Sequence, residues 1–256
     1  MQDIYDEEAL EKLEEKQHDQ TLESLLILAA LASVTRGRIE DELRSFYQKY
    51  GKDGVVTYAE ARKWVSQKDR RRRLNTLLFS IQLSFIDVYP KFEQEFRDML
   101  TKVMEMELSF FAIDIDLTDF PLRWGIDNLD WADRLVNDIE KWTAVIQSDI
   151  KRGILQRKNI NDLLKDIEKR FNSIESVLES LSVSETSAAS SIIRHEIFRE
   201  LGIDKYQFYT RADERTCETC GAMHGLIFPM SAYEVGVTAS PMHPRCRCWE
   251  VPISSE

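Results

Sequence analysis

The residues best suited to chemistry in this sequence are gathered in one short stretch near its end. All four cysteines of the chain lie there, namely Cys217, Cys220, Cys246 and Cys248. They form the patterns C-x-x-C and H-P-R-C-R-C, the second of which begins with His243. Thiolate sulfur and imidazole nitrogen are ligands that zinc prefers in proteins. Their collection in one stretch of an otherwise cysteine-free chain predicts a metal site.

A zinc ion needs four ligands in a tetrahedral arrangement, and C-x-x-C can supply two of them from one tight turn. The second pair must come from the later group, where His243 with Cys246, or Cys246 with Cys248, has a spacing that can reach one ion. We predict the set Cys217, Cys220, His243 and Cys246, with Cys248 as the alternative to His243 or Cys246. Such a set is closed to water and substrate, so the predicted Zn²⁺ is structural and no catalytic residue is assigned.

The cysteines have two other interpretations. The N-terminus, M-Q-D-I-Y-D-E-E, is too acidic for a secretory signal, so we expect synthesis in the cytosol, where metal binding is favoured over disulfides. A redox C-x-x-C pair needs a preceding strand and a helix that starts at the first cysteine; Gly221 and the second cysteine group argue against it. His224 directly precedes Gly225, and we predict a turn residue there, not a ligand.

The alternative function is a zinc-containing nuclease or another enzyme that acts on nucleic acids, with Asp213, Arg215 and His243 as its active groups. The stretch offers no second histidine pair and no evident general base beside a phosphate site. We therefore expect that the protein is not an enzyme.

A third possibility is a DNA-binding accessory factor. The most basic run of the chain ends with four arginines, Arg70, Arg71, Arg72 and Arg73. These could contact phosphates, although a solvated helix face is the competing interpretation. The net charge of -11 argues against a broad nucleic-acid-coating surface. No apolar run approaches the ~20 residues of a membrane helix, so no membrane partner is expected.

The elements that must position the ligands are three short strands, predicted at residues 206–210, 226–229 and 247–253 from their alternation and β-branched or aromatic content. In the third strand, alternation places Arg247, Trp249 and Val251 on one face and Cys246, Cys248 and Glu250 on the other. A module this small buries little surface, so it needs a metal, disulfides or a partner to stay folded.

The rest of the chain has the periodicity of helices. Helices are predicted over residues 3–50, 74–88, 91–108 and 130–151 and over one or two further segments up to 201, with Pro90 separating the second from the third. Residues 113–128 are predicted to be an irregular connection with short strand character. We expect a mainly α fold of long helices with a small C-terminal zinc-stapled α+β module of about three short strands. The segments are 1–129, an N-terminal helical region; 130–204, a helical lead-in; and 205–256, the zinc-binding module.

The terminal stretch resembles a known family. D-E-R-T-C-E-T-C-G-A-M-H-G-L-I-F followed by P-M-H-P-R-C-R-C is similar to the C-terminal signature of tailed-phage head morphogenesis or minor capsid proteins, the phage Mu protein F-like family. The matching positions are Asp213, Arg215, Thr216, Cys217, Cys220, Gly225, Phe228, Pro241, His243, Cys246, Arg247 and Cys248. With a helical lead-in that is also similar, the resemblance covers about residues 131–252. Where the family often shows Arg-Thr-Glu, this chain has Val183-Ser184-Glu185, so only the acid is kept.

The resemblance implies a virion component and not a catalyst. Members of the family associate with the portal during procapsid assembly, and some are linked to DNA packaging or delivery. The implied partners are therefore the portal protein and, beyond it, a scaffold or major capsid protein, with DNA as a further candidate through the arginine run. The implied location is the capsid interior or portal vertex, after synthesis in the host cytoplasm.

Overall fold

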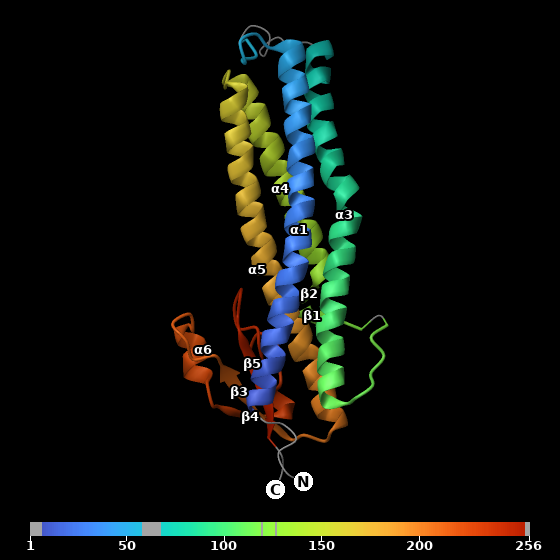
Figure 1. Cartoon of the computed structure of the whole chain (residues 1–256), viewed down its shortest axis with the longest axis vertical. Helices are drawn as coiled ribbons and strands as arrows, with labels where there is room; N and C mark the ends of the chain where they lie inside the picture. Colours follow the sequence, from blue (N-terminus) through green and yellow to red (C-terminus); the bar gives the residue numbers. More distant parts are fainter. Residues whose placement is uncertain (1–6, 58–67, 119, 126, 254–256) are drawn as a thin grey trace. The chain divides into compact units, whose positions relative to one another are not determined.

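The computed structural model describes residues 7–57, 68–118, 120–125 and 127–253. Long helices make up most of this part of the chain, and a three-stranded sheet lies near its C-terminal end (Figure 1). The expected fold class, mainly α with a small C-terminal α+β module, is confirmed. None of the described helices holds an apolar stretch long enough to cross a bilayer.

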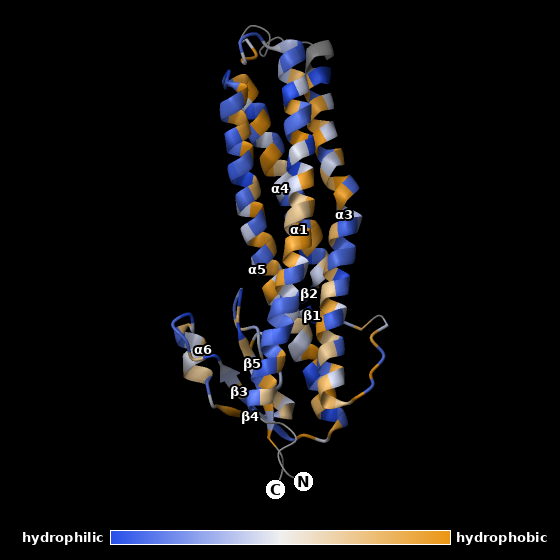
Figure 2. Ribbon diagram, in the orientation of Figure 1, coloured by the Kyte–Doolittle hydropathy of each residue, from blue (hydrophilic) through white to orange (hydrophobic). Residues whose placement is uncertain are grey.

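Four long helices precede the three-stranded sheet in the sequence. Their bounds are α1 Glu7–Tyr50, α3 Lys68–Phe111, α4 Trp131–Leu155 and α5 Ile160–Glu200. Each has a stripe of apolar side chains at helical spacing, seen as orange bands beside blue polar bands in Figure 2. In α1, for example, Leu28, Ile39 and Leu43 are fully buried. Burial of such a stripe is what stabilises these helices, because propensity alone contributes little.

One helix boundary predicted from the sequence is wrong. We expected Pro90 to separate two helices, but α3 runs through it without interruption. A proline inside a helix costs about 3 kcal/mol, because it removes one backbone hydrogen bond and crowds the preceding turn. Phe85, Val88, Phe92 and Phe96 on either side of it are all buried. Each such side chain contributes about 1.5–3 kcal/mol, so together they outweigh the proline.

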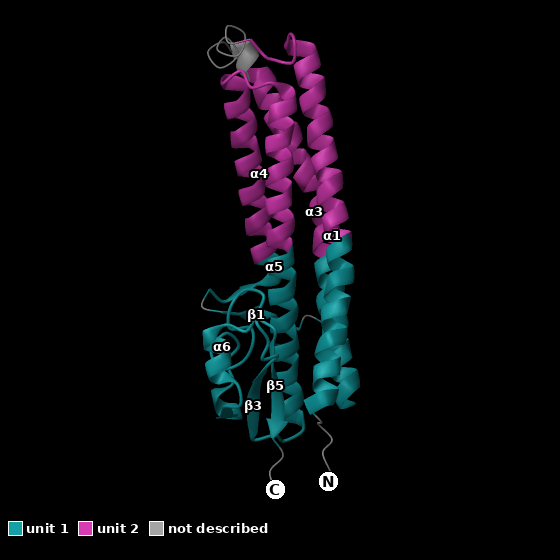
Figure 3. Cartoon of the chain, turned by 60° about the vertical axis from the view of Figure 1, so that its left-hand side comes forward, with its two compact units in different colours: residues 1–26, 95–133, 179–256 teal, residues 27–94, 134–178 magenta. Residues whose placement is uncertain are grey.

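The described chain divides into two compact units, coloured teal and magenta in Figure 3. The magenta unit comprises residues 27–94 and 134–178, and most of its described residues lie in segments of α1, α3, α4 and α5. Its core includes the stacked rings of Phe85 and Phe171, whose centroids are 6.2 Å apart. Asp149 on α4 pairs with Arg170 on α5, at 2.6 Å between its carboxylate and the guanidinium.

The teal unit comprises residues 1–26, 95–133 and 179–256, so it contains the sheet and the parts of α1, α3 and α5 around it. The irregular connection after α3 contains the short strands β1, Arg123–Trp124, and β2, Leu129–Asp130, as expected. The indole nitrogen of Trp124 donates to Glu185 on α5 over 2.9 Å. Glu185 is buried, and this bond gives it a structural role.

All three predicted strands are present, as β3 Lys205–Thr210, β4 Ile227–Pro229 and β5 Cys248–Ile253. β3 lies in the middle and pairs antiparallel with both neighbours. Phe208 lies opposite Glu250, and Thr210 lies opposite Cys248, so these side chains share one face. Tyr209 and Trp249 stack on the other face, with ring centroids 6.2 Å apart. The sheet thus brings the end of β3 next to the cysteine pattern that opens β5.

Candidate metal centre

The first two candidate ligands lie at the start of a short helix. Cys217 is the N-cap of α6, Glu218–Met223, and its sulfur accepts a hydrogen bond from the Cys220 backbone nitrogen over 3.4 Å. This bond is the largest cause that lowers the pKa of the Cys217 thiol. The sequence predicted a tight turn, and Gly221 together with the second cysteine group argued against a redox pair, but α6 runs through Gly221. A strand and a helix do flank C-x-x-C, so only the second cysteine group still argues against that interpretation.

The loop between β3 and α6 is held by the Asp213 carboxylate. It accepts hydrogen bonds from the Arg215 backbone nitrogen at 3.0 Å, the Thr216 hydroxyl at 3.4 Å and the Arg247 guanidinium at 2.7 Å. The bond from Arg247 is the main reason that the pKa of Asp213 falls to about 2. Asp213 therefore joins the loop before Cys217 to the segment that carries the later ligands.

The later ligands sit on a loop that leads into β5. The Cys246 backbone nitrogen donates to the His243 carbonyl over 3.1 Å, which closes a turn between them. The Arg245 backbone nitrogen donates to the Ser184 hydroxyl of α5 over 3.1 Å. At the start of the loop, the Ser240 backbone nitrogen donates to the buried carboxylate of Glu250 over 2.6 Å. The loop is thus fixed to both α5 and β5.

The orientation of His243 suits metal binding. Its Nδ1 is 2.9 Å from the Pro244 carbonyl oxygen, and its Nε2 is 3.3 Å from the Cys220 sulfur. A proton on Nδ1, donated to that carbonyl, leaves the Nε2 lone pair directed at the thiol group. In many metalloproteins, a hydrogen bond from one ring nitrogen of a histidine determines that the other ring nitrogen binds the metal.

Two of the distances between donor atoms are close to those around one tetrahedral ion. Two sulfurs bound to one zinc are about 3.8 Å apart, and a sulfur and a nitrogen about 3.6 Å. The sulfurs of Cys220 and Cys246 are 3.9 Å apart, close to the first value, and the Cys220–His243 distance of 3.3 Å is near the second. Among the described residues, two groups have donor atoms within 4.8 Å of one another: Cys217, Cys220 and His243, and Cys220, Cys246 and Cys248. The five residues could therefore hold a metal.

One side of the site packs against apolar side chains. Cys220, Cys246 and Cys248 are buried in one cluster with Phe208, against which Met223, Phe228 and Met242 also pack. None of the four cysteines forms a disulfide. A buried site with sulfur and imidazole donors is typical of structural zinc sites, in which all ligand positions are filled by the protein.

Without metal, the pKa values of the thiols differ from one another. A hydrogen bond from the Cys248 thiol, only partly offset by burial, lowers the pKa of Cys246 to about 5, and the same bond raises the pKa of Cys248. Burial raises the pKa of Cys220 to about 12. For His243, burial lowers the pKa, but the Pro244 carbonyl and the nearby thiol groups together raise it above its ordinary value. A bound divalent cation would favour thiolate at all of the sulfurs it contacts.

The structure places the other predicted site residues as follows. His224 ends α6, where its Nδ1 accepts from the Thr210 backbone nitrogen over 3.2 Å, in agreement with the predicted turn residue. Asp213, one of the three groups of the nuclease alternative, is engaged in the loop. Of the arginine run, the structure describes the side chains of Arg72 and Arg73, which are exposed on α3, and the Arg73 guanidinium lies 5.0 Å from the Tyr50 ring centroid.

Sequence reasoning missed a buried ionic cluster that supports the site. Arg194 of α5 is 1% exposed and pairs with Glu107 of α3, Glu14 of α1 and, at 3.9 Å, Glu250 of β5. The Glu250 carboxylate also accepts from the hydroxyls of Ser191 and Tyr233. The signal in the sequence was a charged residue inside an apolar pattern, in S-S-I-I-R-H and in C-W-E-V. Such a residue is rarely buried unless it is paired.

Comparison with known proteins bears on this part of the chain. Residues 144–251 match the model of a family described as phage Mu protein F like protein. The match takes in the whole of α5, β3 and β4, the first four residues of β5 and all five candidate ligands. It confirms the resemblance inferred from the terminal signature. The chain matches no curated protein and no solved structure at a significant level.

Proposed function

We propose, from the membership of residues 144–251 in the phage Mu protein F-like family, that this chain is a minor capsid protein that takes part in phage head morphogenesis. The family match is the observation that carries the proposal, because it spans the complete Cys/His site and the helix that supports it. The family is one of structural head proteins, so the proposed role is not enzymatic.

Within this role, we propose that Cys217, Cys220, His243 and Cys246 bind a structural Zn²⁺, with Cys248 as the alternative ligand. The observed donor distances support a tetrahedral ion, and Cys220 belongs to both groups of neighbouring donors. The metal would supply a link between α6 and the loop before β5 that the thin sheet does not provide by itself. The hydrogen bonds that fix Cys217, the loop at Asp213 and the His243 ring support this set.

The proposed partner is the portal protein, with a scaffold or major capsid protein as a further partner in the procapsid. Apolar surface on the unit formed by residues 27–94 and 134–178 supports a protein partner. An apolar hollow of about 490 Å³ lies there between α3 and α4, lined by residues that include Phe85, Ile86 and Ile139. Phe79 and Ile86 on α3 are more than half exposed. Exposed apolar surface of this kind commonly marks a protein interface. The proposed location is the capsid interior at the portal vertex.

Co-sedimentation of the full chain with purified portal protein tests this role. We expect co-migration, and we expect Ile86→Asp to weaken it because the new charge would be buried at the interface. Val237→Asp is the matched control, since Val237 is an equally exposed apolar residue in the other unit. Failure to co-migrate, together with unchanged procapsids from a phage that lacks this gene, would contradict the proposal.

A zinc nuclease is less well supported. Asp213 is held by three hydrogen bonds, and the His243 Nε2 faces Cys220 and not an open position. Arg215 lines the same hollow as His243, but an arginine alone supplies neither a nucleophile nor a general base.

A further inference from the structure

Four arginines gather beside the candidate metal centre, although the chain as a whole is strongly acidic. Arg211, Arg215, Arg245 and Arg247, here called the arginine rim, line one hollow together with Cys217, Cys220 and His243. No carboxylate lines that hollow among the described residues. The rim comes from two segments, the loop after β3 and the loop before β5, and the ion pair between Arg247 and Asp213 joins these loops.

Two of the four charges are not balanced by an ion pair. Arg247 pairs with Asp213 at 2.7 Å, and Arg245 pairs with Glu179 at 3.0 Å. Within the described residues, neither Arg211 nor Arg215 has a carboxylate within ion-pair distance, and Arg215 is exposed. A Zn²⁺ held by three thiolates and a histidine carries one net negative charge, so it would offset only one of these two guanidinium charges.

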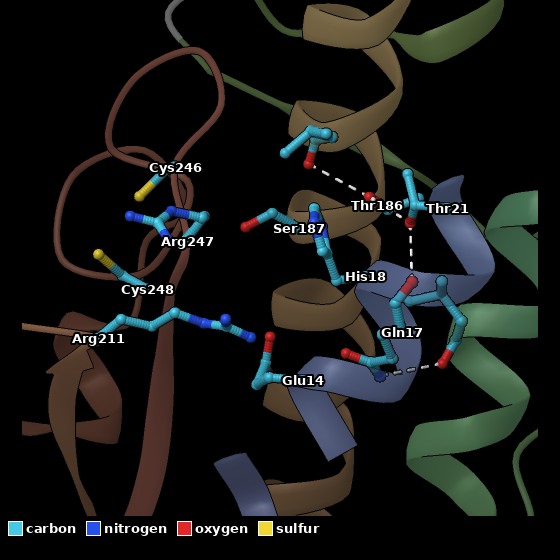
Figure 4. Close-up of a pocket in the computed structure, with 12 residues that line it drawn as sticks. Glu14, Gln17, His18, Thr21, Thr186, Ser187, Arg211, Cys246, Arg247 and Cys248 are labelled. Atoms are coloured by element: carbon cyan, nitrogen blue, oxygen red, sulfur yellow. Dashed lines mark hydrogen bonds between the residues drawn. The ribbon is translucent and has the colours of Figure 1, made fainter. Parts of the chain in front are cut away.

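The charge of the rim acts as far as α1. A second hollow is also lined by Arg211 and Arg247, and on its other side by Glu14 and His18 of α1 and Ser187 of α5 (Figure 4). Figure 4 shows the Arg211 side chain extending towards α1, where Glu14 and His18 lie. Burial is the main cause of a lowered pKa at His18, and the charges of Arg211, Arg247 and Arg215 lower it further, against Asp19. The field of the rim therefore reaches α1.

The chemistry of the hollow at the rim favours a phosphate over a protein segment. Its described lining offers guanidinium and hydroxyl groups, including those of Thr210 and Thr216, and no large apolar side chain. Protein interfaces are usually built around such an apolar or aromatic anchor, whereas guanidinium groups match phosphate oxygens in pairs.

We propose that the arginine rim binds backbone phosphates of DNA, without reading its sequence, and that Arg211 and Arg215 carry most of this binding. The site differs from the arginine run at 70–73 that the sequence suggested. It deepens the proposed head-protein role and rests on that role only for the source of the DNA. Binding through phosphates alone is sequence-independent and sensitive to salt.

Fluorescence anisotropy of a labelled DNA duplex with the full-length, zinc-loaded chain tests the proposal across a range of salt concentrations. Each phosphate contact contributes a slope of about 0.9 to the dependence of log affinity on log salt. Arg211→Gln with Arg215→Gln should therefore lower the slope by about 1.8. Because the two salt dependences meet at about 1 M, the affinity should fall about 60-fold at ~0.1 M salt. Arg72→Gln with Arg73→Gln is the matched control, which removes the same charge on α3 and should leave both values unchanged.

Further variants and competition measurements complete the test of DNA binding. Arg211→Lys with Arg215→Lys should keep the slope, and unchanged zinc content in each variant shows that the fold is intact. Inorganic phosphate should compete only at high concentration, and polyglutamate should compete less well than unlabelled duplex. Equal losses in the rim and control variants would overturn the proposal, as would stronger competition by polyglutamate, which would indicate an acidic protein partner. Portal co-sedimentation should be unaffected by the rim variants, so this proposal can fail while the head-protein role stands.

Discussion

At the scale of single residues, Cys220 is the central residue of the candidate metal centre. It is the one residue common to both groups of neighbouring donors, and its sulfur lies near His243 on one side and Cys246 on the other. The sequence could predict that these residue types meet, because C-x-x-C and H-P-R-C-R-C are ligand patterns. It could not rank five donors for four positions, because the choice depends on distances that spacing alone does not give.

Single ligand variants test the predicted set. Cys220→Ser and His243→Ser should lose bound zinc on dialysis, whereas Cys248→Ser should retain it. Loss of the metal should lower stability by about 4 kcal/mol when free zinc exceeds the dissociation constant a thousandfold, measured by urea unfolding. Zinc retained by His243→Ser and lost by Cys248→Ser would instead assign Cys248 as the fourth ligand.

A second residue-scale prediction concerns the pH dependence of stability. Burial raises the pKa of Glu14 to about 7, although Arg194 opposes the shift and Glu107 reinforces it. A carboxyl group with a folded pKa above its unfolded value of about 4.3 contributes stability below pH 4.3, and that contribution is lost as pH rises through 7. Glu14→Gln mimics the protonated form. As pH rises from about 4.3 to 7, the free energy of unfolding of this variant should therefore increase relative to that of the unsubstituted chain, by on the order of 1–3 kcal/mol. Urea unfolding at several pH values checks this, and a constant difference would contradict it.

At the scale of elements, the buried ionic cluster determines how β5 lies against the helices. Arg194 holds carboxylates from α1, α3 and β5, so three elements far apart in the sequence meet at one guanidinium. The strands themselves were predictable from alternation and composition. Their packing against α5 was not, because periodicity says nothing of which polar residues pair once they are buried.

Removal of that guanidinium should be costly. Arg194→Met leaves buried carboxylates without their partner, and a broken buried pair costs about 3–5 kcal/mol. Arg199→Met on the same helix removes an exposed arginine that pairs with Glu196, and it should cost less than about 1 kcal/mol. Equal effects of the two substitutions on urea unfolding would show that the cluster has no special role.

The proline in α3 allows a further test at this scale. Since packing of the flanking aromatic residues outweighs Pro90, its replacement by alanine should restore a backbone hydrogen bond and stabilise the chain by up to about 3 kcal/mol. A destabilised Pro90→Ala variant would show instead that the local geometry set by the proline is needed for packing. The sequence predicted a break at Pro90 because proline is unfavourable inside a helix. The helix continues because burial of the flanking side chains outweighs that cost.

At the scale of the whole molecule, the fold class was predictable because long stretches of the chain repeat one period and the last stretch changes it. The compact units follow spatial contacts and combine residues far apart in the sequence, such as 1–26 with 179–256. The three segments drawn from composition, 1–129, 130–204 and 205–256, therefore remain a prediction of sequence organisation. The arginine rim also escaped notice, because its members are separated by up to 36 positions and meet only when the two loops are joined.

The central claim is that sulfur and imidazole groups at the two ends of the terminal module bind one structural zinc ion. Elemental analysis of the purified full-length chain, combined with titration of reactive thiols, tests it most directly. We predict about one zinc per chain, with the thiols protected until a chelator removes the metal and the terminal sheet loses protection from hydrogen exchange. A folded chain that contains no metal and four reactive thiols, or cysteines joined in disulfides, would contradict the account.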